Sequence, residues 1–255
     1  EELTEMNDAI RKSVENSSNY CDWLEMGLFA SKGLDKSIDE ESAITQSIGY
    51  FEKVLELQPG NLFAMAELAK VYQRRNMLVD VENIFKQILE KDPENIAVHK
   101  KLAELYQSQN RYDESISEYK QLIELEHGNG EYYIKIIDII KEMYSKAPNK
   151  AQLHASILKE YQTNAEANPK DSMLNFSLGY AYLTLGSGLT PTPSEEEQQK
   201  AIYYIKLANS NDPNNLWPYW GLKIVYSKQS IMGKHMYDEA IAICKKALKI
   251  DENNA

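Results

Sequence analysis

The most constraining feature of this chain is an interval of 34 residues that occurs twice in succession. It separates Pro59 from Pro93 and Pro93 from His127 (93 − 59 = 34 and 127 − 93 = 34). A proline cannot continue a helix, because it lacks an amide proton and its ring clashes with the preceding turn. A fixed period of this length, with prolines at two of its three boundaries, predicts a repeat architecture.

Residues 62–93 show what one interval contains. An apolar stripe recurs at i, i+3, i+4 and i+7, which indicates one face of a helix, at Met65, Leu68, Ala69 and Tyr72. After a polar break, a second stripe comes at Val81, Ile84, Phe85, Ile88 and Leu89. Two short amphipathic helices cannot bury their stripes alone, so we expect successive copies to stack.

The next interval repeats this spacing, at Leu102, Ala103 and Tyr106 and then at Ser115, Tyr119 and Leu122. The pattern resembles the tetratricopeptide repeat, whose unit reads Trp-x-x-Leu-Gly-x-x-Tyr, then Ala-x-x-x-Phe, then Pro. An earlier copy carries the first part of that signature at Trp23, Met26 and Gly27. The resemblance implies an all-α fold, a right-handed α-solenoid of about six stacked helix-turn-helix repeats.

The repeat positions also divide the chain. Residues 1–18 are expected to form an N-terminal helix or cap, in which Leu3, Met6 and Ile10 pack on the first repeat. Repeats 1 to 6 then occupy residues 19–59, 60–93, 94–127, 128–169, 170–213 and 214–255. The last five residues read like the turn into another helix, so we expect the array to continue beyond residue 255.

Repeat 6 admits two registers. In the first, Tyr219, Leu222 and Tyr226 keep the distance from Pro213 that the regular copies keep from their prolines. In the second, Trp217, Trp220 and Gly221 match the family signature more closely. We prefer the first register, because distance from the preceding proline is what holds in the regular copies.

Four repeats have a lengthened turn between the Tyr and Ala positions of the signature. That spacing is 9 residues in repeats 2 and 3 (81 − 72 and 115 − 106), but 17, 17, 19 and 14 in repeats 1, 4, 5 and 6 (47 − 30, 157 − 140, 201 − 182 and 240 − 226). The surplus either lengthens helices by about one turn of 3.6 residues or builds a binding edge on one side of the array. Capping boxes at Ser37–Glu40 and Ser194–Glu197 favour early helix starts, and residues 186–193 read as a loop.

Composition excludes several classes of function. The net charge of −11 argues against nucleic acid, which is bound largely by Lys and Arg. No run of about 18 apolar residues is present, so no membrane span is predicted. The cysteines, Cys21 and Cys244, offer no disulfide framework and fit a reducing compartment such as the cytoplasm, with a removed targeting or anchor segment left open.

The sequence carries no recognisable motif of catalysis. The histidines stand far apart with no metal-like spacing, and no phosphate loop, dinucleotide fingerprint or Gly-x-Ser-x-Gly elbow is present. Thr190 and Thr192 are each followed by proline, which is compatible with phosphorylation sites. The alternative is that they belong to a plain loop. We therefore predict no catalytic residues, no metal and no cofactor.

The family resemblance implies that the first helix of each repeat lines a concave groove for a ligand. The residues on that face become candidates for partner binding: Lys70, Lys100, Lys101, Glu104, Lys135, Phe176, Tyr180, Trp217 and Trp220. The aromatic ones either anchor a partner or pack on one another, and the sequence leaves both readings open. The family's carboxylate clamp is not expected, because its positions fall on Ala66, Lys70, Lys101, Glu131 and Lys135.

The sequence therefore predicts a non-catalytic scaffold that binds a peptide or a segment of another protein in its groove. The alternative is an assembly module of a larger complex, using the edge formed by the lengthened turns and including self-association.

Overall fold

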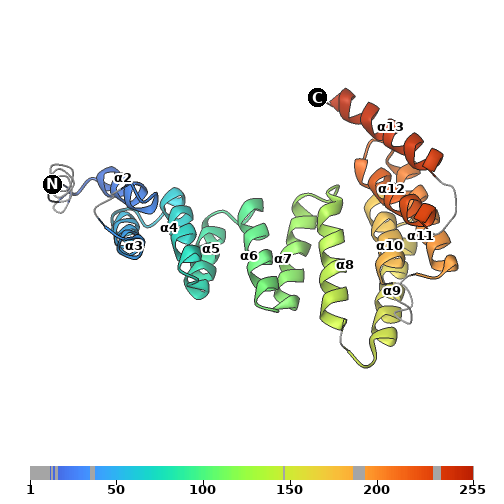
Figure 1. The fold of residues 1–255 in the computed structure, drawn as a ribbon, viewed down its shortest axis with the longest axis horizontal. Helices are drawn as coiled ribbons and strands as arrows, with labels where there is room; N and C mark the ends of the chain where they lie inside the picture. The colour runs from blue at the N-terminus through green and yellow to red at the C-terminus, as the bar shows by residue number, and fades with distance from the viewer. Residues whose placement is uncertain are drawn as a thin grey trace. The chain divides into compact units, whose positions relative to one another are not determined.

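The computed structural model describes residues 12, 14, 17–34, 38–145, 147–185, 193–231 and 237–254. These residues form helices α2 to α13 and no strand (Figure 1). The all-α fold is therefore confirmed for this part of the chain. Leu3, Met6, Ile10, Thr190 and Thr192 lie outside the described residues.

The helices follow one another as α2 (Tyr20–Ser31), α3 (Glu40–Leu57), α4 (Leu62–Arg74), α5 (Leu78–Lys91), α6 (Ile96–Ser108), α7 (Tyr112–Leu125), α8 (Gly130–Tyr144), α9 (Lys150–Ala167), α10 (Ser172–Thr184), α11 (Glu195–Asn211), α12 (Leu216–Ile231) and α13 (Tyr237–Asn254). Consecutive helices pack on each other as hairpins in the pairs α2–α3, α4–α5, α10–α11 and α12–α13, and α8 touches α9 less extensively. From the second hairpin onward, each first helix begins at the third residue after a closing residue, namely Pro59, Pro93, His127, Pro169 and Pro213.

The chain divides into two compact units, Glu1–Leu105 and Tyr106–Ala255. In the first unit α3 packs between α2 and α4, α4 packs on α5, and α2 also touches α4. In the second unit α10 is central and contacts α8, α9, α11 and α12. The contacts of α8 with α10 and of α10 with α12 place the first helices of these repeats side by side.

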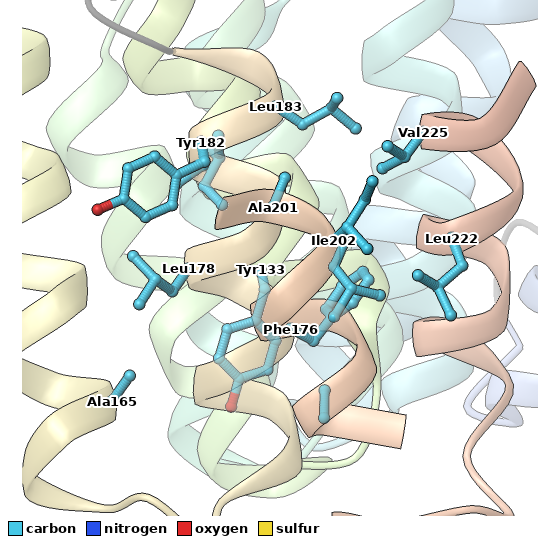
Figure 2. Packing of buried hydrophobic residues seen from close by; sticks show 14 of the residues in the cluster. Tyr133, Ala165, Phe176, Leu178, Tyr182, Leu183, Ala201, Ile202, Leu222 and Val225 are labelled. Atoms are coloured by element: carbon cyan, nitrogen blue, oxygen red, sulfur yellow. The ribbon is translucent and has the colours of Figure 1, made fainter. Parts of the chain in front are cut away.

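The core of the second unit gathers where α10, α11 and α12 meet, and Figure 2 shows their side chains converging. Small residues allow the backbones of α10 and α11 to lie close to each other. A Cβ on Gly179 of α10 would lie 2.5 Å from Ile205 Cγ1 and 3.0 Å from the carbonyl oxygen of Ala201 on α11. The Gly and Ala positions of the family signature are thus the place where the two helices of this hairpin come closest.

Helix starts are set by the polar residues that precede them. Asn19 and Asn61 cap α2 and α4 by accepting hydrogen bonds from backbone amides. The capping box of Ser194 and Glu197 is present at α11. Ser37 lies outside the described residues, and α3 is capped instead by Asp39, whose carboxylate accepts from the Ser42 amide at 2.8 Å.

The surplus residues lengthen the second helix of the longer repeats. Helices α3, α9 and α11 have 18, 18 and 17 residues, against 14 in α5 and α7. In repeats 1 and 4 the second helix starts 7 residues before the Ala position of the signature (47 − 40 and 157 − 150). In repeats 2 and 3 it starts only 3 residues before that position (81 − 78 and 115 − 112), so the extra helical residues of repeats 1 and 4 lie at the helix start. Helix lengthening by about one turn, the first interpretation, therefore describes these repeats.

Repeat 6 has the preferred register. Tyr219, Leu222 and Tyr226 are buried, as the residues of the apolar stripe are in the earlier repeats, whereas Trp217 and Trp220 are only half-buried. The residue ranges assigned to the individual repeats remain predictions.

The close approach of α10 and α11 generates a test of stability. Replacing Gly179 with Ala should destabilise the protein by about 1–3 kcal/mol, because the added methyl meets backbone and a buried side chain. Urea unfolding measured by circular dichroism gives the change.

A matched control is Gly49→Ala inside α3, where a Cβ would meet nothing within 4 Å. This control should raise stability by about 0.5–1 kcal/mol, because alanine is the better helix former. A Gly179→Ala protein as stable as wild type would contradict the packing described above.

Candidate partner-binding surface

Four aromatic side chains on α10 and α12 form a continuous row, here called the aromatic row: Phe176, Tyr180, Trp220 and Trp217. Ring centroids lie 6.4 Å apart for Phe176 and Tyr180, 5.9 Å for Tyr180 and Trp220, and 5.8 Å for Trp217 and Trp220. These separations are typical of attractive aromatic contacts. The structure thus brings together all four aromatic candidates of the sequence analysis.

Phe176 is not available to a partner. Its side chain is completely buried, and a Cβ on Gly221 of α12 would lie 3.0 Å from its ring. The side chain packs beneath α12 because Gly221 leaves room for it. Its prediction as a binding residue is therefore corrected: of the two open readings, packing applies to Phe176.

Trp217 connects repeat 6 to repeat 4. A Cβ on Gly130, the first residue of α8, would lie 2.5 Å from Trp217 Cγ, so the indole rests directly on that glycine. Beside it, the Asn215 amide donates to the Gly128 carbonyl oxygen at 3.0 Å, and its oxygen accepts from the Trp217 amide at 2.9 Å. Trp217 thus has a packing role at the N-terminal ends of α8 and α12.

Tyr180 and Trp220 keep part of their surface exposed. The Tyr180 hydroxyl donates to Asp138 Oδ1 on α8 at 3.3 Å. Burial, and next the charge of Asp138, raise the pKa of Tyr180 to about 12. The Trp220 indole N–H has no hydrogen-bond acceptor among the described residues, so it remains able to donate to a ligand.

Trp220 borders a groove of about 350 Å³ between α12 and α13, here called the α12–α13 groove. Its walls are mainly apolar, with Lys223 and Asp251 as its charged members, and include Leu216, Tyr219, Ile243, Cys244, Ala247 and Leu248. Leu248 is 60% exposed, so an apolar surface is offered to solvent here. The sequence did not predict this groove, because it lies between two helices of one hairpin rather than on the first helices alone.

The charged candidates belong mostly to the first unit. Lys70 pairs with Glu67 at 2.6 Å, and Lys101 pairs with Glu104 at 3.0 Å, each within one helix. Such exposed pairs are worth only about 0.2–1 kcal/mol, so a ligand can displace them at small cost. Lys100 is half-buried on the same helix as Lys101, and Lys135 is exposed on α8 in the second unit.

Histidines in the described residues have structural contacts. His127 contacts Asp171 through Nε2 and the Tyr133 hydroxyl through Nδ1, both at 2.9 Å. His154 is buried on α9 with Nδ1 3.1 Å from the Leu185 carbonyl oxygen, and burial lowers its pKa. In the part of the chain that the structure describes, no group of three or more His, Cys, Asp or Glu could hold a metal ion.

None of the described helices is long and apolar enough to cross a membrane.

Comparison with known proteins agrees with the repeat pattern. Family models of the tetratricopeptide repeat match residues 77–135 and 234–254. The search of curated proteins found no match. A chain built from such hairpins is a helical-repeat protein. More specifically, these two segments are similar to tetratricopeptide repeats, and proteins of that family are generally scaffolds for protein interactions.

Several solved structures are similar at low identity. The crystal structure of MamA is 17% identical, covering 84% of this chain and 92% of that chain, with a TM-score of 0.37. YrrB, described as a tetratricopeptide protein with an unusual peptide-binding site, is 15% identical, covering 84% and 98%, with a TM-score of 0.42. A tetratricopeptide protein of Parabacteroides merdae is 13% identical, covering 89% and 79%, with a TM-score of 0.43. Similarities of this size transfer no ligand to this chain.

The contact of Trp217 with Gly130 can be tested by adding one methyl group. Gly130→Ala should displace the indole, because the new Cβ would lie 2.5 Å from Trp217 Cγ. The indole N–H signals of the three tryptophans in a proton–nitrogen NMR spectrum report this. We expect the Trp217 and Trp220 signals to shift and that of Trp23 to stay; an unchanged Trp217 signal would refute the contact.

The Tyr180 pKa predicts a dependence of stability on pH. A folded-state pKa raised to about 12, from an ordinary 10.0, favours the folded state fully below pH 10. That contribution is lost as pH rises from 10 through 12. The stability difference between wild type and Tyr180→Phe should therefore shrink over this range, as measured by urea unfolding at pH 9, 10 and 11. A constant difference would mean that the hydroxyl is as solvated as in the unfolded chain.

Proposed function

We propose that this protein is a non-catalytic scaffold whose second unit binds a segment of another protein through Trp220, Tyr180 and the α12–α13 groove. The observation that carries the proposal is the position of Trp220: a half-exposed indole, with an N–H that has no acceptor among the described residues, at the border of an open apolar groove.

The aromatic row favours binding because it holds Trp220 in place. Trp217 and Tyr180 contact the indole from two sides, so a ligand orders little that is not already ordered. Side chains immobilised on binding cost about 0.5–1.5 kcal/mol each, and this preorganisation reduces that cost. Tryptophan and tyrosine are also the residue types that contribute most to protein interfaces.

The preceding repeat indicates what shape the groove accepts. Trp220 is the seventh residue after Pro213, as Phe176 is after Pro169, and Cys244 and Ala247 correspond to Ile205 and Ala208 by the repeat pattern. Phe176, Ile205 and Ala208 are completely buried, and α12 lies against α10 and α11 there. We infer that the ligand presents a helix to the α12–α13 groove, with a small residue over Trp220.

Truncation of Trp220 tests the proposal. Trp220→Ala should lower affinity for a partner about tenfold or more while leaving the helix content unchanged, because the indole supplies the desolvated anchor. Partners are identified by quantitative affinity capture with the wild-type chain, and their dissociation constants are then measured by calorimetry.

The matched control is Tyr203→Ala, which removes an aromatic ring that is 62% exposed on α11 and outside the aromatic row. Its affinities should equal those of wild type. Unchanged affinity in Trp220→Ala would exclude the α12–α13 groove as the binding site. A light-scattering mass that shows a dimer in wild type, but a monomer in Trp220→Ala, would instead support the assembly alternative.

A further inference from the structure

The fourth repeat carries large side chains where other repeats carry small ones. Ile137 occupies the position of Gly27 and Gly179, and Ile157 occupies that of Ala201. In those repeats the glycine lies directly against the second helix, at Phe51 or Ile205. Two isoleucines cannot approach so closely, and α9 packs more extensively on α10 than on its own partner α8. The hairpin of α8 and α9 is therefore opened.

The opened hairpin leaves a pocket of about 390 Å³ between α7, α8, α9 and α10, here called the repeat-4 groove. Most of its lining residues are apolar, and several of them are only half-buried: Ile116, Ile123, Ile140, Met143, Ile157 and Tyr161. No lining residue is shared with the α12–α13 groove. A volume of this size accommodates a few apolar groups of a ligand.

The repeat-4 groove runs along the helices. On α7 its lining residues are Asp113, Ile116, Lys120 and Ile123, which recur at helical spacing and so share one face. At 1.5 Å per residue this face is about 15 Å long, close to three helical turns. A groove of this length, walled by α7 and α9 with α8 between them, fits the apolar stripe of a short amphipathic helix.

The rim of the groove is charged and mainly acidic. Asp113 and Lys120 on α7 and Glu160 on α9 are exposed, and none has an ion-pair partner among the described residues. Two carboxylates to one ammonium favour a ligand with basic residues beside its apolar stripe. A second copy of this chain fits less well, because the net charge of −11 makes two copies repel.

We propose that the repeat-4 groove binds a basic amphipathic helix of another protein, at a site separate from the α12–α13 groove. Apolar side chains of that helix enter between Ile140 and Ile157, and its Lys or Arg residues pair with Asp113 and Glu160. The Tyr161 ring adds to the apolar lining that this helix would contact. The two grooves together allow one chain to connect two partners.

The test uses synthetic helical peptides of about 20 residues. The basic probe is alanine-based with Leu at i, i+4 and i+7 and Lys at the flanking positions; the acidic probe has Glu in place of each Lys. Binding to the full chain is monitored by methyl NMR of isoleucine. We expect the basic probe to shift the signals of Ile116, Ile123, Ile140 and Ile157 saturably and to bind about tenfold more tightly than the acidic one.

Charge reversal supplies the decisive variant. Asp113→Lys with Glu160→Lys changes only exposed side chains, so the fold is kept, and the preference between the two probes should reverse. Trp220→Ala should leave binding of the basic probe unchanged, which separates this site from the proposed function above. Equal affinity for both probes, or shifts confined to Ile134 and Ile224 outside the groove, would overturn the proposal. Shifts of the same groove signals on dilution of the protein alone would assign the groove to a second copy and overturn it as well.

Discussion

The close approach of two helices within a hairpin is the constraint on which the second unit depends. At Gly179 no side chain separates α10 from Ile205 and the backbone of Ala201, so α10 and α11 bury their stripes against each other. Their shared surface then receives α12, and Phe176, Leu222 and Val225 become part of one core (Figure 2). Packing in a repeat protein is a sum of such neighbour contacts, so a change at one position alters the surface of the repeats next to it.

In repeat 4 that constraint is relaxed. With Ile137 and Ile157 in the small-residue positions, α9 keeps its contact with α10, and the space beside α8 stays open. In a regular repeat these apolar side chains fill the space between the two helices of the hairpin. Here they form the walls of a groove. Burying apolar surface contributes about 25 cal/mol per Å², which is the part of the free energy that a ligand in this groove would gain. Departure from the regular repeat thus leaves an open apolar groove lined at positions that elsewhere form core.

Periodicity in the sequence accounts for most of the fold. The stripes in residues 62–93 and the prolines locate the helices, and Asn61 and Ser194 act as caps because capping depends only on residues a turn apart. The contact of Trp217 with Gly130 could not be predicted in this way, because it joins repeats 4 and 6 and no local pattern encodes it. The displacement of α9 could not be predicted either: the sequence shows the isoleucines, but the direction in which a hairpin opens depends on its neighbours.

The aromatic row shows why residue type alone does not separate binding from packing. Phe176 and Trp220 hold the same position in consecutive repeats, and both were candidates for a ligand. Phe176 is buried because α12 brings Gly221 over its ring, whereas Trp220 faces the open α12–α13 groove. The chemistry of the two side chains is alike, so the difference arises from the helix that covers one of them. Whether an aromatic side chain in such an array packs or can bind is therefore decided by the helices next to it and not by its residue type.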